Sequence, residues 1–141
     1  MLEVFRINHK DNLFLEVRNI RREVFVEGQG VSISDEYDNF EIYAQHYLVA
    51  KMGIYCAAAR WRKTDLGIKL ERFAVLESFR GQNIGKFLLE EVIKDVIFYD
   101  KLIYLHAQIQ VVGFYNKFNF FKQGDLFEEA GIEHYKMVFK S

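Results

Sequence analysis

The segment Arg80-Gly81-Gln82-Asn83-Ile84-Gly85 has the residue types and spacing of a site that could bind phosphate. It follows an apolar, strand-like run at 70–76 and precedes a long segment with the hydrophobic periodicity of an amphipathic helix. A glycine-containing turn between a strand and a helix leaves backbone N–H groups free at the positive end of the helix dipole. Because such a site attracts anions, the sequence predicts that this turn binds a pyrophosphate group.

Composition and charge exclude several kinds of protein. The 19 basic and 20 acidic residues are interspersed and give a formal net charge of -1, which argues against a general nucleic-acid-binding protein. The single cysteine, Cys56, excludes an internal disulfide framework and a cysteine-rich zinc site. No apolar run approaches the roughly 20 residues that span a bilayer, and the first residues lack the apolar stretch of a signal peptide. We therefore expect a cytoplasmic protein that binds neither nucleic acid nor a membrane.

The elements that would position the turn follow from the hydrophobic pattern of the chain. Alternation and short apolar runs predict strands at 2–7, 47–51, 54–63, 68–76, 102–107, 120–125 and 134–140. Apolar spacings of three and four predict helices after Asp11, near 37–44, at 82–99 and at 112–118. The segment 27–38 has no period and is predicted to be a surface loop, which often contacts substrates. With 141 residues and no break in composition, the chain is expected to form one α/β domain of the α+β kind over 1–141.

This order of elements resembles the GNAT superfamily of acetyl-CoA-dependent N-acetyltransferases. The resemblance rests on the Arg-Gly-x-x-Ile-Gly turn after the fourth strand and on Phe114-Tyr115-Asn116-Lys117-Phe118-Asn119-Phe120 after the fifth. Other segments are most similar to a small bacterial single-domain group: Arg22-Glu23-Val24-Phe25-Val26, Glu36-Tyr37-Asp38, Ala59-Arg60-Trp61-Arg62, 70–75, Ala107-Gln108 and 127–134. The resemblance implies a GNAT fold: a mixed, mostly antiparallel central sheet of six to seven strands with about four flanking helices, in which the fourth and fifth strands are parallel and splay apart.

Two positions depart from the pattern of the family. Glycine is usual in the phosphate turn where Asn83 stands, and again after the following short helix where Asn119 stands. Asparagine tolerates a positive φ better than other non-glycine residues, so both turns are expected to form. The departure at Asn83 leaves less room for a phosphate and therefore concerns cofactor affinity rather than the fold.

The resemblance implies acetyl-CoA as the cofactor. In the family, the pantetheine arm binds exposed backbone of the fourth strand, and an N–H group that corresponds to one near Val75 faces the thioester oxygen. The pyrophosphate lies on the turn before the long helix. The implied cofactor-binding residues are Phe73, Ala74, Val75, Arg80, Gly81, Gln82, Asn83, Ile84, Gly85, Lys86 and Asn116.

The resemblance also implies two catalytic residues. Tyr115 corresponds to a tyrosine beside the thioester sulfur and is predicted to protonate the departing thiolate, whereas the alternative is a tyrosine that only packs. Glu71 is the candidate base that accepts a proton from the amine, which requires that a partly apolar cleft raise its pKa. The alternative is that Glu71 forms cross-strand ion pairs with Arg60, Arg62 or Arg72.

Four residues are candidates for contact with the acceptor amine. Glu36 and Asp38 could bind the positive charge of an amine. Strand alternation places Arg60 on a face of its strand that borders either the cleft or solvent. His134 could contact the substrate or relay a proton. The alternative for each is a solvated or structural role.

The remaining histidines and the cysteine have simpler interpretations. His46 also matches a family position and could relay a proton, although a histidine at the end of a strand is commonly a hydrogen-bonded structural group. His106, in the fifth strand, is interpreted as structural. Cys56 is interpreted as a small buried hydrophobic residue rather than an acyl carrier.

The sequence thus predicts an N-acetyltransferase that moves an acetyl group from acetyl-CoA to a primary amine of a small molecule, or of a peptide, by direct attack in a ternary complex. One alternative is a non-catalytic module that binds acyl-CoA or a partner, suggested by Asn83 and by the open question of the base. Another is an acyltransferase like the acyl-homoserine-lactone synthases, although this chain is short for that group. No metal is expected, and the aromatic-rich composition is compatible with a homodimer.

Overall fold

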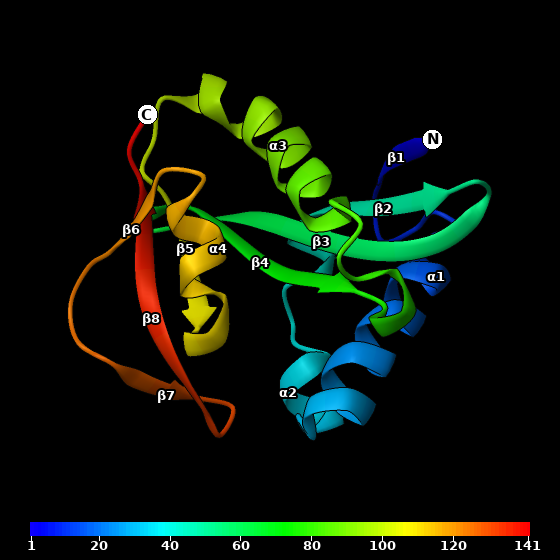
Figure 1. Cartoon of the computed structure of the whole chain (residues 1–141), viewed down its shortest axis with the longest axis horizontal. Coiled ribbons are helices and arrows are strands. Elements are labelled where there is room, and N and C mark those ends of the chain that lie inside the picture. Colours follow the sequence, from blue (N-terminus) through cyan, green and yellow to red (C-terminus); the bar gives the residue numbers. More distant parts are fainter.

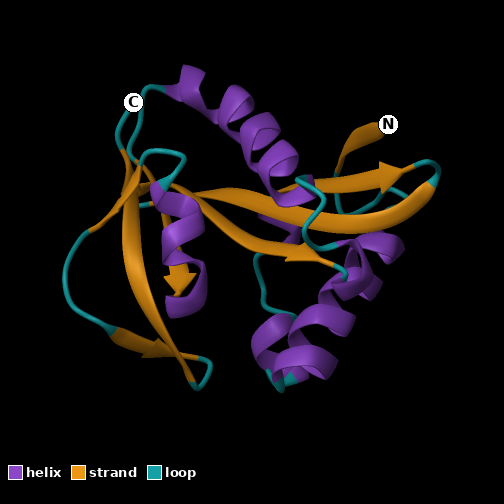
Figure 2. Cartoon of the chain, in the orientation of Figure 1, coloured by secondary structure: helices purple, strands orange, loops and turns teal.

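A computed structural model describes all residues of the chain, Met1–Ser141. One eight-stranded sheet forms the centre, with helices against both of its faces (Figures 1 and 2). The strands are β1 (Leu2–Ile7), β2 (Gln45–Lys51), β3 (Ile54–Thr64), β4 (Gly67–Val75), β5 (Ile103–Gln108), β6 (Phe120–Lys122), β7 (Phe127–Glu129) and β8 (Ile132–Phe139). The α-helices are α1 (Phe14–Arg21), α2 (Ile33–Glu36), α3 (Ile84–Val96) and α4 (Val112–Asn116).

The sheet has the order β1-β2-β3-β4-β5-β8-β6, and β7 pairs with β8. Every pair is antiparallel except β4 with β5, which α3 connects as a crossover between parallel strands. The predicted mixed, mostly antiparallel sheet with one central parallel pair is therefore confirmed.

The sheet has one strand more than the six to seven expected. The additional strand, β7, has three residues and pairs with β8 across a tight turn at Ala130 and Gly131. Both turn residues have positive φ, 52° and 76°, which suits a two-residue hairpin. A strand this short carries too few alternating residues to give a sequence signal.

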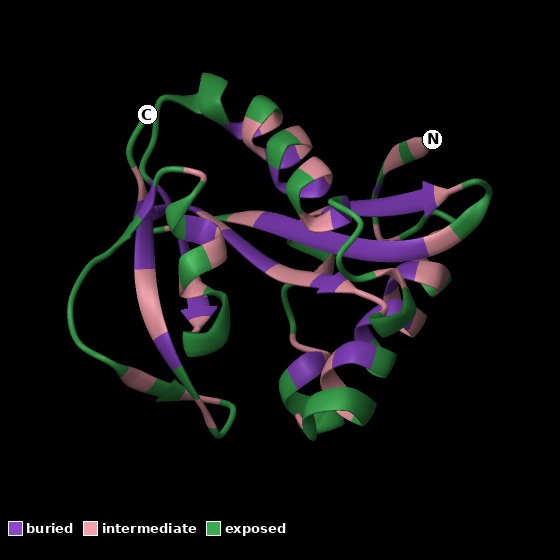
Figure 3. Cartoon of the chain, viewed as in Figure 1, coloured by how far each residue is buried: buried purple, intermediate pink, exposed green.

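Side chains alternate between two cores on opposite faces of the sheet. Tyr47 and Val49 of β2 belong to the core that α3 covers, whereas Leu48 between them packs with Val17 and Ile20 of α1. Figure 3 shows the buried residues gathered in the central strands and on the inner sides of the helices. The hydrophobic patterns that predicted these strands and helices are thus satisfied by burial on both faces.

The helices differ from the prediction mainly at their ends. No α-helix forms at 37–44, where only a 3-10 turn at Glu41–Tyr43 is present. The short helix α2 lies instead in the segment 27–38 that was predicted to be a loop, because the Ser32 side chain caps it through the Asp35 N–H at 3.1 Å. The first helix continues beyond α1 as a π-helical segment, Arg22–Glu27. None of the helices has the length and apolar character needed to cross a bilayer.

Candidate active site

The strands β4 and β5 separate part of the way along their length. They pair only at residues 68–70 with 103–105, although β4 continues to Val75 and β5 to Gln108. A β-bulge bends β4 at this point, because Arg72 (φ 59°) and Phe73 together oppose the single residue Ala59 of β3. The predicted splay of the two strands is therefore confirmed, with its cause in the bulge.

The backbone of Val75 is directed into the gap between the two strands. The next residue, Leu76, donates its N–H to Cys56 of β3 at 2.9 Å. Because successive residues of an antiparallel strand point their N–H and C=O groups in opposite directions, those of Val75 point away from β3. Its carbonyl accepts a hydrogen bond from Arg80 Nε at 3.0 Å, and its N–H has no partner in the chain.

A cleft of about 860 Å³ occupies this gap and extends from the start of α3 to β7. It brings together residues far apart in sequence. The predicted site residues that line it are Glu36, Asp38, Glu71, Phe73, Ala74, Val75, Arg80, Gly81, Asn83, Ile84, Gly85, Lys86, Tyr115 and His134. Three predicted site residues, Arg60, Gln82 and Asn116, do not line the cleft.

The turn before α3 offers a row of free backbone donors at one end of the cleft. None of the N–H groups from Gly81 to Lys86 donates a hydrogen bond within the chain, and no side chain caps α3. Gly81 (φ 77°) and Asn83 (φ 63°) both take left-handed conformations. Asn119 does so as well (φ 68°), so both asparagines adopt the conformation expected of them. A row of unsatisfied N–H groups at a helix start is suited to an anion.

Tyr115 closes the middle of the cleft on the side of α4. Its ring lies edge-on to Phe73 (6.4 Å between centroids) and Phe114 (5.1 Å), and it is 8% exposed. Its hydroxyl makes no hydrogen bond within the chain. Burial raises the pKa of the Tyr115 phenol, so the group keeps its proton at neutral pH. Tyr115 therefore lies on the cleft wall in its protonated form, as a residue that donates a proton to a group bound in the cleft must.

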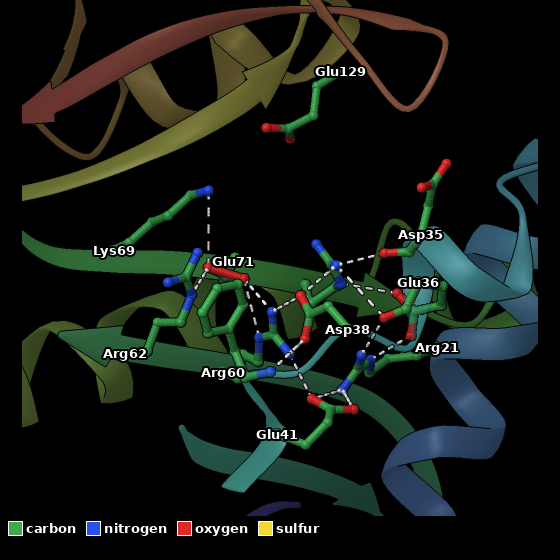
Figure 4. A network of polar contacts seen from close by, with 12 residues as sticks. Arg21, Asp35, Glu36, Asp38, Glu41, Arg60, Arg62, Lys69, Glu71 and Glu129 are labelled. Carbon is green, nitrogen blue, oxygen red and sulfur yellow. Dashed lines mark hydrogen bonds and ion pairs between the residues drawn. The ribbon is translucent and has the colours of Figure 1, made fainter. Parts of the chain in front are cut away.

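A buried ion-pair network, here called the arginine network, borders the cleft opposite β5 and β7 (Figure 4). Arg60, which is 0% exposed, donates to Asp38 at 2.6 and 3.0 Å and also contacts Glu41 and Glu71. The members are Arg21, Arg60, Arg62 and Arg72 with Glu36, Asp38, Glu41 and Glu71. Lys69 adds a fifth cation 3.9 Å from Glu71, so each carboxylate of the network has at least one cationic partner.

Glu71 is held by this network. It accepts hydrogen bonds from Arg60 Nε at 3.1 Å and Arg62 Nε at 2.7 Å, and Lys69 Nζ lies 3.9 Å away. Burial opposes its ionisation, but the charges of Arg60, Lys69 and Arg62 outweigh burial and lower the pKa of Glu71. The expectation of a raised pKa is therefore wrong. Of the two interpretations of Glu71, the structure supports the cross-strand ion pair, since Arg60 faces Glu71 in the β3–β4 register.

The structure also changes the expected roles of Glu36, Asp38 and Arg60. Glu36 is 1% exposed and lies between Arg21, at 2.6 Å, and Arg72, at 2.9 Å. Asp38 pairs with Arg60 and Arg72. Both carboxylates line the cleft, but neighbouring guanidiniums already balance their charges, so neither is free to hold an ammonium ion. Arg60 is absent from the cleft wall because its side chain is enclosed by its carboxylate partners.

Asp38 is expected to make the stability of the protein depend on pH in acid. Burial opposes its ionisation, but hydrogen bonds from Arg60 lower the pKa of Asp38 to about 2. An unfolded Asp has a pKa of about 3.9, so this carboxylate stabilises the fold above pH ~4 and loses that effect as the pH falls toward 2. In urea unfolding, Asp38→Asn should lower the free energy of unfolding by on the order of 2 kcal/mol at pH 6 and by less than half of that at about pH 2.5.

The matched control for this measurement is Asp125→Asn, at an exposed aspartate. It should leave the free energy of unfolding within about 0.5 kcal/mol of the original at both pH values. An equal loss at both pH values in Asp38→Asn would contradict a lowered pKa at Asp38.

The histidines fall into two groups. His46 is fully buried outside the cleft, with Nε2 2.9 Å from the carbonyl of Glu41 and its ring against Phe14, which supports its structural interpretation. His134 and His106 both line the cleft, on either side of Glu129. His106 Nδ1 lies 3.0 Å from Glu129 Oε1, and His134 Nε2 lies 3.9 Å from Glu129 Oε2.

Sequence reasoning did not select several polar residues of the cleft wall. Lys69, Arg72, Glu129 and Gln108 line the cleft, and His106 was interpreted as structural only. Strand alternation could have placed Lys69 on the same face as Glu71. Glu129 had no usable signal because its strand is so short. Cys56 is fully buried, as expected, and donates to the Val49 carbonyl at 3.6 Å.

Comparison with known proteins identifies similar chains. A family model described as "Acetyltransferase (GNAT) domain" matches residues 31–141. A Bacillus subtilis (strain 168) protein named as an acetyltransferase is 36% identical over 125 residues, which is 84% of each chain. Escherichia coli ElaA is 31% identical over 125 residues, 84% of this chain and 82% of ElaA. The crystal structure of ElaA superposes with a TM-score of 0.87 and covers 99% of this chain and 100% of that one.

One further solved structure is similar to this chain in its fold alone. The crystal structure of an acyl-CoA N-acyltransferase from Pseudomonas aeruginosa superposes with a TM-score of 0.86 at 23% identity. It covers 99% of this chain and 100% of that one. The overall fold of this chain is thus found in a solved structure.

Proposed function

This chain belongs to the GNAT acetyltransferase family and is an acyltransferase, and from that premise we propose that it transfers an acetyl group from acetyl-CoA to a primary amine of a small acceptor. The transfer is direct, in a ternary complex of enzyme, acetyl-CoA and acceptor. The observation that carries the proposal is the row of free N–H groups from Gly81 to Lys86, which opens onto the same cleft as Val75 and Tyr115.

The residues of the cleft fit coenzyme A at three points. The free N–H groups of the turn before α3 would bind the pyrophosphate, and Lys86 adds positive charge there. The unpaired edge of β4 from Phe73 to Val75 would accept and donate hydrogen bonds to the amides of the pantetheine arm. Arg80 is bound to the Val75 carbonyl, so its role is to fix the turn against the end of β4. The side chain of Gln82 contacts Lys51 and Ser78, and Asn116 lies outside the cleft, so neither side chain is assigned a contact with coenzyme A.

Acetyl-CoA supplies an acyl group activated as a thioester. The N–H of Val75, directed into the gap, would stabilise negative charge that develops on the acyl oxygen. Tyr115 would donate its proton to the departing sulfur. The apolar surroundings that raise the pKa of Tyr115 also raise the pKa of a thiol formed beside it, so burial does not by itself widen the gap between donor and leaving group.

The proposal is tested by calorimetry of coenzyme A binding together with release of free thiol from acetyl-CoA in the presence of a panel of amines, peptides included. We expect saturable binding and turnover with at least one small primary amine. Binding without turnover across the panel would support the alternative of a non-catalytic acyl-CoA-binding module. Absence of both binding and turnover would refute the proposal.

The conformation of Asn83 gives a test of the phosphate turn. Asn83→Gly removes the side chain from a left-handed position and should leave the Kd for coenzyme A unchanged or lower. Asn83→Val places a β-branched residue there at a cost of about 1–2 kcal/mol, so the Kd measured by calorimetry should rise roughly 5- to 30-fold. The control Asp100→Val places the same side chain at an exposed left-handed position (φ 53°) outside the cleft and should change the Kd less than about 2-fold. Equal Kd values for the two valine variants would mean that the turn conformation does not control binding.

A further inference from the structure

A histidine and a carboxylate form a hydrogen-bonded pair on the wall of the cleft opposite the arginine network. His106 of β5 and Glu129 of β7 both line the cleft, and Nδ1 of His106 lies 3.0 Å from Oε1 of Glu129. The His106 ring is fixed edge-on against Phe127 with 4.9 Å between centroids. In Figure 4, Glu129 lies apart from the network, across the gap from Lys69 and Glu71.

The pair lies on the opposite face of the sheet from Tyr115. Leu105 and Ala107 belong to the core shared by α3 and Tyr115, so His106 between them points to the other face of β5. The β4–β5 gap therefore has a tyrosine at one face and a histidine at the other. Transfer of an acyl group through this gap needs a proton donor on the side of the departing sulfur and a proton acceptor on the side of the attacking amine.

We propose that His106 is the general base of the reaction, through Nε2, and that Glu129 is a positioning residue that fixes its ring. This proposal rests on the function proposed above, because it assigns the base of that same transfer. An ionised carboxylate can only accept, so Nδ1 of neutral His106 carries the hydrogen and Nε2 carries the lone pair. Nε2 makes no hydrogen bond within the chain and is available to an acceptor bound in the cleft.

The protons of the transfer balance with these two residues. His106 Nε2 takes one proton from the acceptor ammonium and gives a neutral amine, whose nitrogen then forms the C–N bond as the C–S bond breaks. The nitrogen loses a second proton to solvent on forming the amide, the sulfur gains one from Tyr115, and solvent returns one proton to Tyr115. The net products are the amide, the free thiol and one proton, which leaves His106 for solvent.

The carboxylates that line the cleft are poorly placed to act as the base. Burial raises the pKa of Glu36, but its side chain is 1% exposed and enclosed by Arg21 and Arg72. Glu71 is held by Arg60 and Arg62, and its pKa is lowered. The hydrogen bond from His106 lowers the pKa of Glu129 itself to about 2, so Glu129 stays ionised and orients the ring. The charged and titratable groups around His106 are Lys69 and Glu71 of β4, His134 and Lys136 of β8, Glu129 of β7 and Tyr104 of β5.

The test compares His106→Gln, Glu129→Gln and the control His9→Gln, which lies outside the cleft. His106→Gln should lower kcat/KM roughly 100-fold at pH 7 and leave the Kd for coenzyme A within about 2-fold. It should also abolish the rising acid limb of the pH profile of kcat/KM. Glu129→Gln should lose less activity, because a neutral amide can still contact the ring at Nδ1 but no longer requires the hydrogen to lie there. His9→Gln should match the original enzyme.

Three readouts separate this proposal from the proposed function. If the original enzyme acetylates an amine and His106→Gln retains more than a third of its kcat/KM, the base is not His106 although the enzyme assignment stands. If His134→Gln instead removes the acid limb, the base is His134 and the proposal is overturned. Independently of turnover, NMR of the imidazole nitrogens should find the Nδ1–H tautomer in neutral His106, and an Nε2–H tautomer would overturn the proposal.

Discussion

Arg60→Met is expected to lower the free energy of unfolding by about 3–5 kcal/mol, measured by urea denaturation at pH 7. Arg60 is fully enclosed and donates to Asp38, Glu41 and Glu71. Methionine fills a similar volume but leaves Asp38, Glu41 and Glu71 without the cation that they share, in a site shielded from water. Removing one partner of a buried ion pair costs more than the pair contributes, because the remaining charge stays desolvated.

The control for Arg60→Met is Arg22→Met, the same substitution at an exposed pair. Arg22 lies 3.8 Å from Glu27, with side chains 49% and 64% exposed, so its loss should cost less than about 1 kcal/mol. Arg60→Lys keeps the charge but not the planar guanidinium that reaches three carboxylates. It should therefore lower the free energy of unfolding by an amount between those of Arg22→Met and Arg60→Met. A free energy of unfolding for Arg60→Met within 1 kcal/mol of the original would show that the arginine network does not need its central cation.

Tyr115→Phe is expected to lower kcat by roughly one to three orders of magnitude, measured as thiol release from acetyl-CoA. The ring packs against Phe73, Phe114 and Phe120, and phenylalanine keeps these contacts. The hydroxyl has no partner in the chain, so its removal leaves no buried group unsatisfied. The substitution should therefore leave the free energy of unfolding nearly unchanged and remove only the proton that the departing sulfur needs.

Three measurements make this prediction specific to proton donation. The Kd for coenzyme A should stay within about 2-fold, and the melting temperature should change little. The control Tyr43→Phe, at a tyrosine 72% exposed and outside the cleft, should keep the original kcat. An unchanged kcat in Tyr115→Phe would return Tyr115 to the alternative of a tyrosine that only packs.

Local sequence patterns predicted most of the strands, helices and turns that surround the site. The turn at Gly81 and Asn83 was predicted because left-handed backbone and a following amphipathic helix are marked by residue type and spacing. The strand, helix and strand from β4 to β5 were predicted for the same reason, and their parallel pairing follows from the crossover connection. The position of Tyr115 on the helix after β5 came from the resemblance, and the structure places it in the cleft.

The states of the acidic residues could not be predicted in this way. Whether Glu71 is a free base or an ion-pair partner depends on Arg60 and Arg62, which β3 presents across the sheet. Whether Asp38 can hold an amine depends on Arg60 and Arg72, which come from strands 22 and 34 residues further along the chain. The sequence shows that cations are available but not which of them contact each carboxylate.

The sequence by itself therefore determined most of the order of elements and the phosphate-type turn, because these follow from interactions between residues close together in the chain. The separation of β4 from β5 was implied only by the resemblance, because it depends on a bulge of β4 opposite β3. Only the tertiary structure decided which ionisable groups are free to act. The contact of His106 with Glu129, for example, requires that β8 pair with β5 on one edge and with β7 on the other. A pKa is set by the charges and burial around a group, and these depend on the positions of distant segments.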